Sequence, residues 1–228
     1  MKTVGIVIPC YNEGASILEL IEKCKSSFHN QVRYLIVNNG STDNSKDILE
    51  RIELPRNIQI LHIENNQGYG FGIIQGLNHL SDDYVGWTHA DLQTDPSDIL
   101  KFLPSINQGI DFMKGNRVGR PVIDRFFTWG MTVLISALFL QRMHDINAQP
   151  TIFHRDLLTQ WHNPPNDFAL DLYAYLVAVK LDCTIVRKKV NFGPRRWGNS
   201  HWNTGLSARL KFIQRTLRIA FRLRVSLR

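Results

Sequence analysis

The feature that most constrains this chain is a fourfold alternation of short apolar strands and amphipathic helices in its first hundred residues. The first strand, residues 4–9, is the continuous run VGIVIP, which is typical of a strand buried on both faces. Further strands are predicted at residues 32–37, 58–63 and 84–88, with helices at 16–27, 44–52, 71–80 and 97–105. This alternation predicts an α/β fold, a Rossmann-like and mostly parallel sheet flanked by helices.

A polar loop follows each of these four strands. The loops are Tyr11-Asn12-Glu13 and residues 38–43, 65–70 and 89–93. Parallel strands end at one edge of the sheet, and ligands bind in the crevice outside their carboxyl ends. Four polar loops at that edge predict a binding site.

The second half of the chain is less regular. Strands are expected at residues 111–117 and 184–192, an irregular and then extended segment at 146–153, and a helix at 167–180. Residues 126–140 are fifteen residues without a charge. A membrane-spanning helix needs about 20 apolar residues, so this segment is predicted to be a buried helix or one that lies in an interface.

The loop after the fourth strand, His89-Ala90-Asp91-Leu92-Gln93, suits a metal ion. Asp91 and Gln93 offer oxygen ligands of the kind that Mg²⁺ or Mn²⁺ takes when it bridges phosphates, and His89 is a third candidate ligand. The alternative is that an aspartate of this loop only caps the helix entered at Pro96.

The positive charge of the chain lies in its last fifth. The chain carries 27 basic and 20 acidic side chains, but twelve of the basic ones follow Asp182 and no acidic residue does. Residues 206–223 have a helical pattern with Lys211, Arg215, Arg218 and Arg222 on one stripe. We therefore divide the chain into a domain at 1–203 and a basic amphipathic helix within 204–228, which either lies on an anionic membrane surface or packs on the domain.

Six motifs give the chain a resemblance to the family 2 glycosyltransferases of the GT-A fold. They are residues 8–13 (IPCYNE), 37–43 (VNNGSTD), 66–70 (NQGYG), 90–96 (ADLQTDP), 115–117 (GNR), and Arg195 through Gly198 to Ser200. Within that family the chain most resembles the polyprenyl-phosphate sugar transferases, typified by dolichyl-phosphate mannose synthase. The motifs occur in family order across roughly residues 1–203.

The resemblance implies a nucleotide-sugar donor, a divalent metal, and a set of residues that contact the donor. These are Pro9, Tyr11, Asn12, Glu13, Asn39, Gly68, Ala90, Asp91, Arg117, Arg125, Arg195 and Ser200. The chain departs from the family at two points, where Asn38-Asn39 replaces a pair of aspartates and His89 replaces the first metal-binding aspartate. The first departure leaves the base open between UDP- and GDP-sugars.

The catalytic base is not marked by a motif. Relatives carry a Gly-Phe-Arg or Gly-Asp-Phe-Arg sequence where this chain has residues 147–150, and no acid stands there. Asp171 and Asp145 are the candidates, and Arg117 is expected to neutralise donor phosphates. Because a phosphate acceptor needs little help from a base, the acceptor is predicted to be a polyprenyl phosphate at the cytoplasmic face of the membrane.

Three competing readings remain. An enzyme with a glycan or other hydroxyl acceptor would need an essential carboxylate. A sugar-nucleotide-binding subunit without activity is a further alternative, because His89 replaces an aspartate. A nucleic-acid-binding module is suggested by the pI of about 9.5, but no nucleic-acid motif is present, so no nucleic-acid partner is expected.

Overall fold

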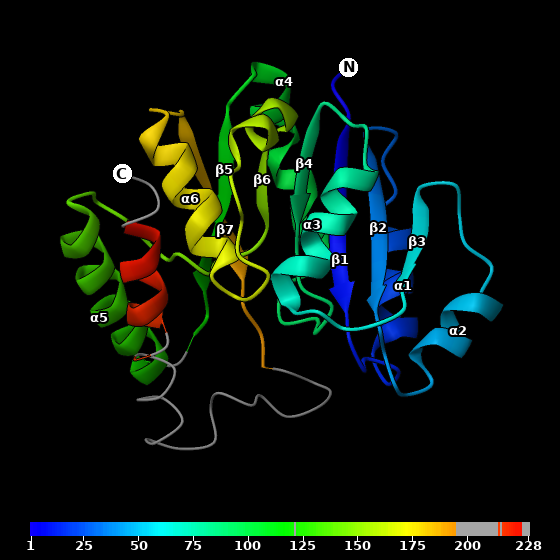
Figure 1. Ribbon diagram of the computed structural model, residues 1–228. Coiled ribbons are helices and arrows are strands. Elements are labelled where there is room, and N and C mark those ends of the chain that lie inside the picture. The colour runs from blue at the N-terminus through cyan, green and yellow to red at the C-terminus, as the bar shows by residue number, and fades with distance from the viewer. Residues whose placement is uncertain (121, 195–213, 215, 225–228) are drawn as a thin grey trace.

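The computed structural model describes residues 1–120, 122–194, 214 and 216–224. Its centre is a seven-stranded sheet in the order β3-β2-β1-β4-β6-β5-β7 (Figure 1). The strands are β1 (Val4–Cys10), β2 (Val32–Asn39), β3 (Ile58–Ile63), β4 (Tyr84–Trp87), β5 (Phe112–Val118), β6 (Thr151–His154) and β7 (Ile185–Asn191). The short β6 runs antiparallel to both of its neighbours, and the remaining pairs are parallel. The prediction of a mostly parallel α/β sheet is confirmed.

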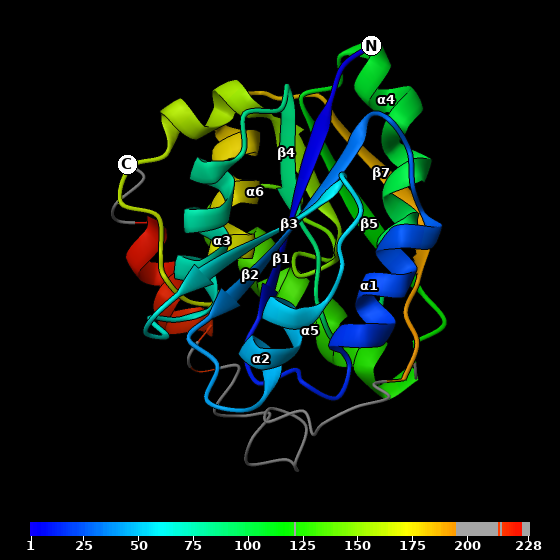
Figure 2. The same cartoon turned by 90° about the vertical axis from the view of Figure 1, so that its right-hand side faces the viewer.

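Helices cover both faces of the sheet. They are α1 (Ile17–Ser26), α2 (Ser45–Arg51), α3 (Tyr69–His79), α4 (Leu103–Gln108), α5 (Val122–Phe139) and α6 (Leu170–Lys180), with 3₁₀ segments η1 (Pro96–Phe102) and η2 (Arg155–Gln160). Figure 2 shows α3 and α6 on one side of the sheet and α1 and α4 on the other. Strand β1 serves both cores, since Val7 faces the α3 side and Ile6 and Ile8 face the α1 side. This two-sided burial is why residues 4–9 are continuously apolar.

The segment predicted as one helix at residues 97–105 is divided in two. It begins as η1, whose first amide, Ser97 N, donates to the capping carboxylate of Asp95 (2.9 Å). The following α4 has Pro104 in its first turn. Proline has no N–H to extend a preceding helical ladder, which explains the change of helix type.

The uncharged segment at residues 126–140 forms most of α5, which begins at Val122. Ile135 is buried in the core on the α6 side of the sheet. None of the helices in the described part of the chain is long and apolar enough to cross a membrane.

The described part of the C-terminal tail is helical at residues 214 and 216–224. Its Ala220 and Leu223 are buried in the same hydrophobic cluster as Ile135 of α5, and Arg224 donates to the carbonyl of Leu138. Figure 1 shows this helix beside α5. One side of the tail therefore packs on the domain, while Arg218, Phe221 and Arg222 remain exposed.

Candidate active site

The carboxyl ends of four parallel strands meet at one edge of the sheet, at the bottom of Figure 1. The register places Cys10 at the end of β1 beside Asn38 of β2, Asn39 of β2 beside Ile63 of β3, and Val7 of β1 beside Trp87 of β4. The polar loops predicted from the sequence therefore leave the sheet side by side.

Asn12 ties the first of these loops to the second. Its side-chain Oδ1 accepts from the backbone amides of Thr42 (2.8 Å) and Asp43 (3.3 Å), and its backbone amide donates to Ser41 Oγ (3.1 Å). The backbone of Asn12 is left-handed (φ 55°), a conformation that asparagine adopts more readily than most residues. Asn12 therefore shapes the loops, while Tyr11 beside it is exposed at the edge.

Asn39 is buried, and only the nitrogen of its side-chain amide has a short hydrogen bond. Its Nδ2 donates to the carbonyl of Gly68 (2.9 Å), which fixes the orientation of the amide. Its Oδ1 is buried and has no hydrogen-bond partner among the described residues. An unpaired buried acceptor is costly, so this oxygen is suited to a donor group on a ligand. The neighbouring Asn38 is already engaged, by His62 Nδ1 (3.1 Å) and by the amide of Ser41 (3.2 Å).

The predicted metal ligands lie in the loop after β4. Asp91 Oδ1 accepts from the amide of Gln93 (3.1 Å), and Gln93 Nε2 donates to the carbonyl of Gly193 (3.1 Å), which leaves the Gln93 oxygen available. His89 is half-buried. Within the described ranges, no group of three or more His, Cys, Asp or Glu side chains is placed to hold a metal. The Asp91 carboxylate and the Gln93 side-chain oxygen are ligands of the kind that Mg²⁺ or Mn²⁺ takes when phosphates and water complete its coordination.

Tyr69, at the start of α3, links this loop to the candidate base. Its ring lies 5.7 Å from that of His89 and stacks on Phe168 at 4.5 Å. The pKa of its buried hydroxyl is raised well above the usual value by desolvation, and then by the carboxylates of Asp171 and Asp91. The two carboxylates thus act on one phenol. Tyr69 stands in the Gly68-Tyr69-Gly70 motif, but it was not among the residues predicted from the sequence to contact the donor.

Asp171 lies in the first turn of α6 and is 2% exposed. Trp87 Nε1 donates to its Oδ1 (3.3 Å), and Gln149 Nε2 donates to the same oxygen. The buried Oε1 of Gln149 has no partner among the described residues. These contacts bring the middle and last thirds of the chain together at the carboxyl end of β4.

Asp145 has a different environment. Arg117 donates to it from Nε (3.0 Å), from its backbone amide (3.1 Å) and from Nη2, and Arg120 lies at 3.9 Å. Although burial raises the pKa of Asp145, the hydrogen bonds and charge of Arg117 outweigh it and hold the pKa below its ordinary value. A carboxylate held in this way is a counter-ion and a poor proton acceptor.

Of the three arginines predicted to contact the donor, the structure describes Arg117 and Arg125. The guanidinium of Arg117 lies 5.2 Å from the Phe192 ring centroid as well as against Asp145. Arg125 is exposed on α5, and Arg195 and Ser200 fall outside the described residues.

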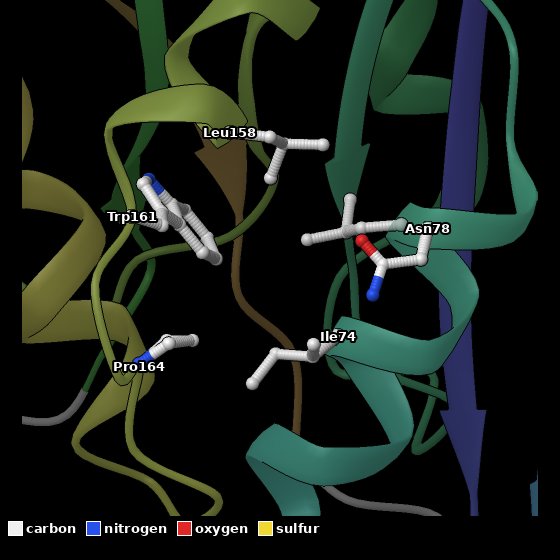
Figure 3. A pocket seen from close by; sticks show the side chains of 6 residues that line it. Ile74, Asn78, Leu158, Trp161 and Pro164 are labelled. Atoms are coloured by element: carbon white, nitrogen blue, oxygen red, sulfur yellow. The ribbon is translucent and has the colours of Figure 1, made fainter.

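A cavity of about 250 Å³ lies between α3 and residues 158–164, which belong to η2 and the segment after it (Figure 3). It is lined by Ile74, Leu77, Asn78, Leu158, Trp161 and Pro164. None of the predicted site residues lines it.

Polar loops at the carboxyl ends of parallel strands, with the unpaired buried oxygen of Asn39 among them, define an α/β protein with a site for a polar ligand. Residues 5–169 match Glycosyl transferase family 2, so the chain belongs to that family. The fold is that of the GT-A glycosyltransferases, and a nucleotide-sugar transferase is the activity that the family supports.

Among solved structures, the chain is similar to glucosyl-3-phosphoglycerate synthase from Mycobacterium tuberculosis bound to Mn²⁺, UDP and glucosyl-3-phosphoglycerate. The TM-score is 0.75 at 17% identity, over 97% of this chain and 80% of that one. The complex of that synthase with Mn²⁺, UDP-glucose and phosphoglyceric acid gives the same score and identity, over 97% and 79%. A further mycobacterial protein matches with a TM-score of 0.75 at 16% identity, over 97% and 74%. At these identities the likeness concerns the fold.

Proposed function

We propose that this protein is an inverting hexosyltransferase that uses a UDP- or GDP-sugar with Mg²⁺ or Mn²⁺. The carrying observation is the position of Tyr69, whose ring lies 5.7 Å from that of His89 and whose hydroxyl is close enough to Asp171 and Asp91 for both charges to raise its pKa. This proximity supports a transfer in which a metal loop on the phosphate side acts together with a nearby proton acceptor.

In the proposed reaction an acceptor oxygen attacks C1 of the sugar, and the bond from C1 to the donor phosphate breaks. The electron pair leaves with the nucleoside diphosphate, and the acceptor proton passes to the Asp171 carboxylate. A metal held by Asp91, with His89 and the Gln93 oxygen, would neutralise charge on the leaving diphosphate. Trp87 and Gln149 hold Asp171 in position through the oxygen to which they donate.

The proposed acceptor is a polyprenyl phosphate, with the protein peripheral on the cytoplasmic face of the membrane. Exposed apolar residues on α5 and the tail support a membrane-facing side, namely Val133, Leu134, Leu140 and Phe221. Exposed cations flank them at Arg125, Arg218 and Arg222. Apolar residues flanked by arginines suit insertion among anionic lipid headgroups.

The placing of Asp171 favours a second candidate, transfer to a hydroxyl group of a glycan or small molecule. A hydroxyl needs a general base, and Asp171 is a buried carboxylate of the required kind. The similar mycobacterial synthase binds phosphoglyceric acid together with UDP-glucose and Mn²⁺, which makes a small phosphorylated acceptor worth including.

The donor is tested by thermal stabilisation with a panel of UDP- and GDP-sugars, each with Mg²⁺ and with Mn²⁺. We expect stabilisation by one base class that requires the metal. Failure to bind or turn over any nucleotide-sugar, with tight and salt-sensitive binding of single-stranded nucleic acid, would overturn the proposal.

The acceptor is tested by comparing Asp171→Asn with Asp145→Asn in transfer to a polyprenyl phosphate, a glycan and phosphoglycerate. With a hydroxyl acceptor, Asp171→Asn is expected to lose about 10²–10⁴-fold in kcat, the usual contribution of a general base. With a phosphate acceptor the loss should be far smaller. In both cases Asp145→Asn should retain donor binding if Asp145 is only a counter-ion.

Membrane association is tested by flotation with vesicles of phosphatidylcholine alone or with phosphatidylglycerol. We expect salt-sensitive binding to the anionic vesicles that weakens in Arg218→Glu/Arg222→Glu. The double variant Lys25→Glu/Lys46→Glu, on the helices α1 and α2, is the charge-matched control. Equal binding by both double variants would contradict the role of the tail.

A further inference from the structure

Lys114 is a lysine where the fold calls for an apolar residue. It lies in the middle of β5 between the buried Met113 and Gly115, and it is 0% exposed. Its ammonium donates to Thr151 Oγ1 at 2.7 Å. Burying an ammonium is costly, and a well-packed apolar side chain in its place is often as stable or more so. Its presence therefore calls for a role beyond packing.

The register of the sheet places Lys114 in a row of polar groups. Trp87 of β4 pairs with Thr151 of β6, Thr151 with Lys114, and Lys114 with Arg187 of β7. Directly paired residues project from the same face of a sheet. An indole, a hydroxyl, an ammonium and a guanidinium thus follow one another across four adjacent strands.

Helix α6 covers this row with two residues one turn apart. At one end Asp171 accepts from Trp87 Nε1 (3.3 Å), and at the other the Tyr175 ring centroid lies 5.1 Å from the Arg187 guanidinium. Lys114 lies in the row between these two contacts. The carboxylate that α6 directs toward the row is that of Asp171, the candidate proton acceptor.

The charges around Lys114 make its protonation depend on Asp171. Its pKa is lowered to about 7, because burial and the charge of Arg187 together outweigh the Asp171 carboxylate, which raises it. The Asp145–Arg117 ion pair has smaller effects on this pKa: Asp145 raises it and Arg117 lowers it. The two side chains therefore attract each other across the row, the ammonium on β5 and the carboxylate on α6.

We propose that Lys114, anchored by Thr151, is a positioning residue whose buried positive charge holds the Asp171 carboxylate in place for proton transfer. The role in transfer rests on the proposed function. It matters most for a hydroxyl acceptor, because a phosphate monoester has already lost most of its second proton, with a pKa of about 6, at the pH where Lys114 titrates. The coupling of the two side chains is a property of the folded protein and is testable without turnover.

The coupling is tested by NMR of the full chain labelled at the lysine side chains, with the Lys114 signal assigned by its loss in Lys114→Met. We expect Lys114 to titrate near neutral pH in the wild type and at lower pH in Asp171→Asn. Asp145→Asn should change the midpoint less. An unchanged midpoint in Asp171→Asn would overturn the inference, whatever the enzyme transfers.

The consequence is tested by the pH dependence of kcat in Lys114→Met and Lys114→Gln, with Lys25→Met as the control lysine. In the wild type, kcat should decline as the Lys114 ammonium loses its proton. Both neutral variants should lose this alkaline decline and show a lower kcat with an unchanged KM for the donor. A merely structural lysine would reduce kcat equally at every pH and leave the shape of the profile unchanged.

Two further results separate the possible failures. Lys114→Arg retains the charge, so it should recover part of the activity at high pH if it folds as judged by thermal unfolding. A Lys114 that titrates with Asp171 in a protein that transfers no sugar would leave the coupling intact and refute the proposed function alone.

Discussion

Trp87 Nε1 lies 3.3 Å from Asp171 Oδ1 and so joins the last residue of β4 to the first turn of α6. Eighty-four positions separate the two residues in sequence. The contact holds the candidate base beside β4, the strand that precedes the predicted metal-binding loop. The geometry of this pair leads to the first prediction.

Replacing Trp87 with Phe removes this hydrogen bond and keeps an aromatic ring. Hydrogen bonds to charged groups contribute about 1.5–3 kcal/mol, so we expect kcat to fall about 10- to 100-fold with little change in donor binding. The matched control is Trp161→Phe, because the buried Nε1 of Trp161 has no partner among the described residues. Equal losses of kcat in the two variants would show that ring volume, and not the hydrogen bond, matters.

Asp91→Asn should weaken the use of metal. The change removes one charged oxygen ligand, and we expect the stabilisation by Mn²⁺ with nucleotide-sugar in a thermal melt to be largely lost. Binding of the nucleoside without phosphates should be retained. Asp156→Asn, at an exposed carboxylate on η2, serves as control. Full metal-dependent stabilisation in Asp91→Asn would argue that the ion is held elsewhere.

Asn39→Asp would restore the carboxylate that is usual in the family, yet it should destabilise this protein. Asn39 Nδ2 donates to the Gly68 carbonyl, and a carboxylate would oppose that oxygen with another acceptor. We expect a loss of about 1–3 kcal/mol in urea unfolding. Asn66→Asp is the control, because Asn66 uses its Oδ1 to accept from the Gly68 amide (2.8 Å), and a carboxylate oxygen can do the same.

Arg117→Met should leave the Asp145 carboxylate buried without its main counter-ion. Removing one partner of a buried pair costs about 3–5 kcal/mol, whereas Lys46→Met in the exposed Lys46–Glu50 pair should cost at most about 0.5 kcal/mol. Chemical unfolding of both variants measures the difference. A small effect in Arg117→Met would indicate that Arg120 alone can balance Asp145.

The Arg117–Asp145 pair should also make the stability of the wild type depend on pH in the acid range. The pKa of Asp145 is lowered in the folded protein, mainly by Arg117 against the opposing effect of burial. Its contribution to stability is therefore complete above the unfolded value of about 3.9 and is lost as the pH falls through the folded pKa. Urea unfolding below pH 5 should show a flatter acid dependence for Asp145→Asn than for the wild type.

The sequence by itself determined the first four strands and the helices that alternate with them. Continuous apolar runs such as residues 4–9 report burial on two faces, a local pattern that the chain carries in its side chains. The loops at Asn12, Asn39 and Asp91 were predictable for the same reason, because a polar segment after a buried strand has one edge at which to emerge.

Tertiary structure alone decided which acid stands beside the predicted metal loop. Asp145 and Asp171 were both candidates from the sequence, and the structure distinguishes them by their neighbours. Two arginines surround Asp145, whereas the Trp87 indole and the Gln149 amide donate to Asp171. The row from Trp87 to Lys114 depends on β6 inserting antiparallel between β4 and β5. Such pairings join residues far apart along the chain, so no local pattern records them, and the charge state of a buried lysine follows from where the sheet places it.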